Sequence, residues 1–286
     1  MDLSKKVRVL ESYSDGRSEF EILEYDKLEG ATDPLMAMAL HFSKEAGLKG
    51  RQVKIKLNNS SIKTESGALY YYKGQISSDA NIGGVGGFFK KSISGALTNE
   101  SAMKPQYTGT GEVYLEPSFK HYMVMELDND SLVVDKGTFY CCSDTIEVKT
   151  FGQKNVSSAL LGGEGIFQIE LKGSGTVILE LYVPKNEIIA YEIKRGEELK
   201  VDGNFALART SGVNFAVTKS DKSLVGSMLN GEGLLNTFTG EGTVWLAPTQ
   251  PMYQSLSFGF MPGNKSMNNT ATNAKNIFGG FGNLID

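Results

Sequence analysis

Apolar and polar residues alternate along short segments from about residue 51 onward. This period of two occurs in QVKIKL (52–57), GEVYLE (111–116), FQIEL (167–171), GTVILELYV (175–183) and GTVWLA (242–247). It is typical of β-strands that bury one face. Gly, Asn and Asp residues separate the segments, as they do where turns join strands. The pattern therefore predicts an all-β fold for most of the chain.

One segment near the N-terminus instead follows helical spacing. We expect a short N-terminal helix at about 33–46, in which Asp33 caps the first turn, Pro34 occupies it and Gly47 follows the last turn. Its apolar stripe consists of Leu35, Met38, Ala39, Phe42 and Ala46. Surface helices usually bury such a stripe, so we expect it to pack on the body of the protein rather than on a membrane or a partner.

The chain repeats one short line, G-x-G-x-V-x-L, three times. The glycines of this line are Gly109, Gly111, Gly173, Gly175, Gly240 and Gly242. They divide the chain into units at about 51–117, 118–184 and 185–250. Because a unit of this size buries too little apolar surface to be stable alone, we expect three tandem β repeats in a pseudo-threefold arrangement around a shared core. The repeated glycines would permit bends or a close approach of strands.

These patterns predict three regions. Residues 1–50 form an N-terminal extension with a strand and the helix, residues 51–250 form the three-repeat β domain, and residues 251–286 form a flexible tail rich in Asn and Gly. The tail ends in the apolar residues Ile277, Phe278, Phe281, Leu284 and Ile285. Since apolar groups cost free energy in water, we expect this tip to contact the body of the protein or a sister chain.

Composition narrows the class of protein. The formal net charge of −4 and the lack of a dense Lys/Arg run make nucleic acid an unlikely partner. No run of 18 apolar residues occurs that could cross a membrane, and the N-terminus lacks the apolar core of a secretory signal. The two cysteines, Cys141 and Cys142, are neighbours and would point to opposite faces of a strand, so we expect reduced thiols and a cytoplasmic location.

Several Gly-anchored segments resemble a known family. They are SGALYYYKGQI, GTGEVYLEP, SLVVDKGTFYCCSDTIEV, LLGGEGIFQIELKGSGTVIL, GEELKVDGNFALA and GEGLLNTFTGEGTVWLAP. The chain is similar over about 51–250 to the family called altered inheritance of mitochondria, member twenty-four. The resemblance implies a tryptophan RNA-binding attenuator-like fold of shortened double-stranded β-helix type, with no established enzymatic activity. Its eukaryotic members are mitochondrial proteins linked to inner-membrane organisation, and its bacterial members are mostly cytoplasmic. This chain has Asn99-Glu100 where the family often has Gly-Glu.

No catalytic constellation stands out. The two histidines, His41 and His121, lie far apart in the sequence and show no metal-ligand spacing, so we expect neither a metal site nor a cofactor. No G-x-S-x-G line is present to carry a nucleophilic serine. Each G-x-G pair opens a β-rich run and lacks the third glycine of a dinucleotide site. We therefore expect a protein that is not an enzyme.

Two segments are candidates for contact with a partner or membrane. The stretch 83–97 combines Phe88 and Phe89 with Lys90 and Lys91, and it would either cover one end of the β domain or touch a membrane or partner. The tail tip offers Phe278 and Phe281 for the same purpose. The three tyrosines at 70–72 could stack on bases or sugars, but we expect them to serve packing.

The most economical hypothesis is a non-enzymatic scaffold or binding protein that acts through assembly or contact with a protein partner or with further copies of itself. Two alternatives remain open. The chain could be a peripheral membrane-surface module, acting through 83–97 or the tail. It could also be a sensor of a small ligand held between repeats or subunits, which rests on analogy of fold alone.

Overall fold

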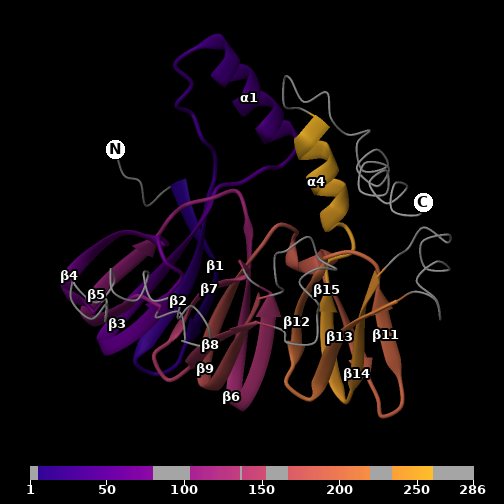
Figure 1. Cartoon of the computed structure of the whole chain (residues 1–286). Coiled ribbons are helices and arrows are strands. Elements are labelled where there is room, and N and C mark those ends of the chain that lie inside the picture. Colours follow the sequence, from indigo (N-terminus) through magenta and orange to yellow (C-terminus); the bar gives the residue numbers. More distant parts are fainter. Residues whose placement is uncertain (1–5, 80–103, 136, 153–166, 220–233, 260–286) are drawn as a thin grey trace, which may run out of the picture. The chain divides into compact units, whose positions relative to one another are not determined.

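The computed structural model consists mainly of antiparallel β-strands (Figure 1). It describes residues 6–79, 104–135, 137–152, 167–219 and 234–259. The chain divides into two compact units, Met1–Pro248 and Thr249–Asp286. Among the described residues the first unit holds one long helix and all the strands, and the second begins with α4 (Gln250–Gly259), which the hydrophobic pattern does not indicate.

The first unit contains a twelve-stranded sheet and a three-stranded sheet in the described ranges. The larger sheet runs β1-β2-β3-β7-β9-β6-β12-β15-β10, with β4 and β5 paired beside β3 and β8 beside β9. The smaller sheet runs β11-β14-β13. In chain order the strands of the first half are β1 (Val7–Ser14), β2 (Ser18–Tyr25), β3 (Arg51–Thr64), β4 (Leu69–Asp79), β5 (Gln106–Leu115), β6 (His121–Asp135) and β7 (Phe139–Ser143). Those of the second half are β8 (Glu147–Gly152), β9 (Phe167–Leu181), β10 (Ile189–Ile193), β11 (Glu198–Val201), β12 (Ala206–Thr210), β13 (Val213–Lys219), β14 (Leu234–Gly240) and β15 (Gly242–Leu246).

The first two G-x-G lines lie within single strands, β5 and β9, where turns could have been expected, whereas the third joins the end of β14 to the start of β15. FQIEL and the first seven residues of GTVILELYV belong to one strand, β9, which continues through Gly173 and Gly175 and ends at Leu181. Each of the six repeated glycines has φ between +108° and +154°, a region that L-residues rarely adopt. At Gly109 a Cβ would lie 1.9 Å from the carbonyl oxygen of Gln75 on β4. The close approach of strands expected from the glycines is therefore present.

One further feature recurs beside each G-x-G line. The strand that pairs with it shifts register by one residue, between Leu69 and Tyr71 on β4, between Phe139 and Cys141 on β7, and again between Ala206 and Ala208 on β12. Such β-bulges increase the local twist of a strand pair. The sheet therefore contains the same local arrangement three times: a strand that carries the V-x-L end of a G-x-G line, paired with a bulged strand.

The apolar side chains of the first unit form three clusters. The largest lies on β6, β7, β9 and β12 and includes Leu179, which is fully buried. The second lies on β2, β3 and β5 around Phe20 and Ile55. The third, around Phe215 and Phe238, belongs to β10 to β15. These clusters hold the strands together by removing apolar surface from water.

The two cysteines are buried free thiols on opposite sides of β7, as predicted. Cys141 belongs to the second cluster and Cys142 to the first, and neither is exposed to solvent. Burial raises the pKa of Cys142 to about 12 and raises that of Cys141 as well. Because the thiolate is the reactive form, both groups are chemically protected in the native state.

We expect neither thiol to react with Ellman's reagent at pH 8 until the chain unfolds. Absorbance at 412 nm should then report two thiols per chain, with a reaction rate that follows the rate of unfolding. Because the pKa of Cys142 is higher in the folded than in the unfolded chain, the protonated thiol favours the folded state. This contribution to the free energy of unfolding is fully present below pH 9 and is lost as the pH rises toward 12. Rapid reaction of one thiol in the native state would contradict this burial.

Candidate functional site

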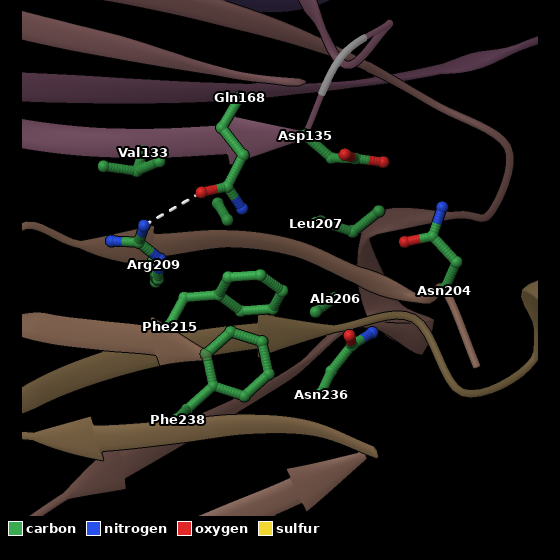
Figure 2. A pocket seen from close by; sticks show the side chains of 11 residues that line it. Val133, Asp135, Gln168, Asn204, Ala206, Leu207, Arg209, Phe215, Asn236 and Phe238 are labelled. Carbon is green, nitrogen blue, oxygen red and sulfur yellow. Dashed lines mark hydrogen bonds between the residues drawn. The ribbon is translucent and has the colours of Figure 1, made fainter. Parts of the chain in front are cut away.

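A small pocket lies where the middle strands meet the third cluster (Figure 2). Val133 and Asp135 come from the end of β6, and Gln168 from the start of β9. The opposite side is formed by the remaining lining residues, Asn204, Ala206, Leu207, Ala208, Arg209, Phe215, Asn236 and Phe238. The cavity volume is about 30 Å³. A space of this size holds about one water molecule, so the pocket excludes a metabolite-sized ligand.

Two charged groups line this pocket, the carboxylate of Asp135 and the guanidinium of Arg209, and the second is buried. The residue is only 7% exposed, although arginine is rarely buried without partners. Its Nη1 donates a hydrogen bond to the carbonyl oxygen of Val213 at 2.9 Å, and Nη2 donates to Oε1 of Gln168 at 2.9 Å. Its buried Nε has no partner. Burial lowers the pKa of Arg209 to about 10, so the side chain still carries a positive charge at neutral pH.

A larger and more open cleft of about 360 Å³ lies beside the turn between β1 and β2. It is lined by Asp15, Arg17, Glu126, Leu127, Asp128, Thr145, Ser174, Gly175 and Thr176. The Ser143 hydroxyl donates to Oδ2 of Asp15 at 2.7 Å. Burial would raise the pKa of Asp15, but hydrogen bonds from Ser143 and from the amides of Ser18 and Arg17 outweigh it and lower the pKa. Asp15 is therefore an ionised, hydrogen-bonded anchor of the turn and a poor general base at neutral pH.

The helix α1 (Pro34–Glu45) forms where the sequence predicts it, but its apolar stripe is not buried. The Asp33 side chain accepts a hydrogen bond from the amide of Met36 at 2.9 Å, and Gly47 follows the helix with φ +70°. None of its residues is buried, and Leu35, Met38 and Phe42 are 73%, 52% and 62% exposed. The expectation that this stripe packs on the body of the protein is wrong.

The helix is carried by an excursion of the chain between β2 and β3 (Figure 1). The amide of Tyr25 donates to the carbonyl oxygen of Gly50 at 2.9 Å, and the amide of Asp26 donates to that of Lys6 at 2.9 Å. The first bond closes the base of the excursion and the second ties its start to the residue before β1, while β2 and β3 continue as paired antiparallel strands. The excursion therefore presents α1 without taking part in the core.

The three tyrosines at 70–72 remain about half exposed on and beside the edge of β4. Tyr71 stacks on Tyr114 with ring centroids 4.4 Å apart, and Tyr70 lies 5.5 Å from Tyr71. The Nζ atom of Lys54 lies 5.6 Å from the Tyr114 ring and 2.7 Å from a carboxylate oxygen of Glu112. The rings thus pack on one another, which fits the packing role only in part because their outer faces stay in solvent.

Several predicted contact residues lie outside the described residues. These are Phe88, Phe89, Lys90, Lys91, Phe278 and Phe281. The two histidines are not brought together: His41 is exposed on α1, and His121 begins β6, where burial and the charge of Arg51 lower its pKa. In the described ranges no group of three or more His, Cys, Asp or Glu side chains could hold a metal ion. The helices that the structure describes include none long and apolar enough to cross a membrane.

Arg209 is the functional candidate that sequence reasoning missed. It stands in ALART, a short strand with no distinctive motif. Its burial depends on Gln168, which is 41 positions away in the sequence, and on the rings of Phe215 and Phe238. The signal available was a single charged residue in an otherwise apolar strand segment.

A mainly antiparallel β protein with an exposed helix between two paired strands is the class that these observations define. The family model described as "Mitochondrial biogenesis AIM24" matches residues 43–249, and the chain belongs to this family. An uncharacterized protein of Streptococcus pyogenes serotype M6 is 20% identical over 233 residues, which cover 74% of this chain and 92% of that protein. A crystal structure of a Streptococcus pyogenes protein superposes with a TM-score of 0.52 and 21% identity, covering 68% of this chain and 87% of that one. The structural match supports the fold alone.

Proposed function

We propose that this protein is a non-enzymatic binding or scaffold protein that contacts a protein partner through α1. The exposed stripe of Leu35, Met38 and Phe42 carries the proposal. These residues stand at positions i, i+3 and i+7, the spacing with which an amphipathic helix enters an apolar groove of another protein. Three large apolar side chains left in water cost free energy that docking would recover.

The rest of the chain serves, in this proposal, as a stable platform for the helix. Its three bulged strand pairs and repeated G-x-G lines support an arrangement of three units about a pseudo-threefold axis. The free, protonated thiols of Cys141 and Cys142 are compatible with the cytoplasmic location that belongs to the same proposal.

The charge of the excursion favours a protein groove over an anionic membrane. Residues 26–50 contain four acidic and three basic residues, Asp26, Glu29, Asp33 and Glu45 against Lys27, Lys44 and Lys49. A net charge of −1 gives no electrostatic attraction to anionic lipid, whereas membrane-surface helices are usually rich in Lys and Arg. The membrane-surface module is therefore the weaker candidate. A small-molecule sensor would have to use the open cleft of about 360 Å³ beside the turn between β1 and β2, because the 30 Å³ pocket offers little room.

The test compares the full chain with a variant in which Leu35, Met38 and Phe42 are all replaced by serine. If the partner is a second copy, light scattering should show that the mass falls to that of a monomer in the variant. A control variant, Val9→Ser, removes an apolar side chain that is 50% exposed on β1 and should leave the mass unchanged.

If the wild-type chain is already a monomer, a photo-crosslinking amino acid at position 38 should link the protein to a distinct partner in cells that make it. The same group at position 9 should give no such product. Equal products at both positions, or none at either, would show that α1 is not a docking element. Sedimentation with phosphatidylcholine vesicles that depends on the three α1 residues would instead favour the membrane module.

A further inference from the structure

Arg209 on β12 and Cys142 on β7 occupy equivalent positions, each opposite the valine of a G-x-G line. Arg209 on β12 pairs with Val244 of the third G-x-G line, and Cys142 on β7 pairs with Val177 of the second. A shared hydrogen bond supports the match: the amide of Thr176 donates to the Ser143 hydroxyl, and the amide of Thr243 donates to that of Thr210. Cys142 is fully buried in the apolar core. The fold itself therefore does not require a charge at this position.

The charge of Arg209 is incompletely compensated by the contacts described. Both of its hydrogen bonds end on neutral oxygens, those of Val213 and Gln168. Glu170 acts on it through space and raises its pKa, but Oε1 of Glu170 accepts a hydrogen bond from the Ser131 hydroxyl at 3.2 Å. A buried cation without a hydrogen-bonded anion carries a large desolvation penalty.

The pocket beside this guanidinium has the size and lining for one small polar occupant. Figure 2 shows Gln168 between Arg209 and Asp135, with Asn204 and Asn236 on the side of the pocket away from Arg209; Gln168 and Asp135 are paired residues of β9 and β6. Asn204 is exposed and gives access from solvent. A water molecule would fit the volume of about 30 Å³ and could accept from the unpartnered Nε. An anion of similar size would do the same and would also neutralise the charge.

We propose that this pocket binds a small anion, of the size of chloride or formate, at the guanidinium of Arg209. The carboxylate of Asp135 lines the pocket as well, and its repulsion disfavours multiply charged anions. The aromatic rings of Phe215 and Phe238 exclude water from the other side and strengthen the interaction between the anion and Arg209. A space for about one water molecule is too small for an anion as large as gluconate.

The experiment is thermal unfolding of the full chain in sodium chloride, sodium formate and sodium gluconate at equal sodium concentration. Chloride and formate should raise Tm along a saturating curve, by about 3 °C at ten times the dissociation constant. Gluconate is too large for the pocket and should not. A rise in Tm that is linear in salt, or equal for all three anions, would overturn the proposal as a general effect of salt.

Two variants locate the effect. Arg209→Met keeps the length of the side chain without its charge and should abolish the difference between chloride and gluconate. Arg8→Met removes an arginine whose side chain is 70% exposed and should leave that difference unchanged. A chloride effect that persists in Arg209→Met would place the anion elsewhere and overturn the proposal. If Arg209→Met does not fold, the wild-type chain still tests the proposal: Tm should rise along a saturating curve with chloride and formate and should not do so with gluconate.

Discussion

Replacing Gly109 with alanine is expected to destabilise the fold by about 4 kcal/mol or more, because the new methyl group has no space. Its Cβ would lie 1.9 Å from the carbonyl oxygen of Gln75, and the backbone φ of +148° is strained for any L-residue. The colliding atom belongs to the backbone of a paired strand, so β4 and β5 would have to separate. Urea unfolding followed by circular dichroism measures the loss, and failure to recover folded protein is its extreme form.

Gly67→Ala is the matched control for this substitution. Gly67 also has a positive φ, +81°, but a Cβ there meets nothing within 4 Å. Only the backbone strain remains, and the loss should be about 1 kcal/mol. Equal losses in the two variants would show that the strands can separate at little cost, and that the glycines of the G-x-G line are not required for close approach.

Replacing Leu179 with alanine is expected to cost about 2 to 5 kcal/mol of unfolding free energy. The side chain is fully buried in the largest apolar cluster, on the central strand β9, so truncation leaves a cavity that the surrounding strands cannot fill. The same chemical change at Leu35, which is 73% exposed on α1, should alter stability by about 0.5 kcal/mol or less.

The pair also separates folding from recognition. If α1 is a docking element, Leu35→Ala should weaken the contact with its partner while Leu179→Ala should act only through stability. Urea unfolding of the two variants measures the difference in stability. Light scattering or crosslinking measures the difference in contact with the partner. A large loss of stability in Leu35→Ala would mean that α1 packs on the body of the protein after all.

Local chemistry was enough to predict the elements that depend on it. Asp33, Pro34 and Gly47 marked the limits of α1, and alternation marked the two halves of β9 that flank Gly173 and Gly175. The single strand β9 was not predicted, because glycine favours a turn when the partner strand that approaches it is unknown. The range matched by the family model, residues 43–249, contains all of the Gly-anchored segments that carry the resemblance.

The exposure of the α1 stripe and the burial of Arg209 depend on residues distant in the sequence, so local patterns did not predict them. Helical spacing shows which face of α1 is apolar, but not what covers that face. The burial of Arg209 is set by Gln168 and by the rings of the third cluster, which no local pattern connects to it. The pseudo-threefold arrangement stays a prediction, supported by recurring bulges and glycines.

The closed base of the excursion has a consequence for how this protein can change. Because Tyr25 and Gly50 are hydrogen-bonded to each other and β2 and β3 pair directly below them, the segment between can be lengthened, shortened or exchanged without loss of core contacts. Substitutions in α1 are therefore released from the selection that maintains the fold. For the same reason α1 can be moved to another pair of antiparallel strands, with the core of this protein left intact.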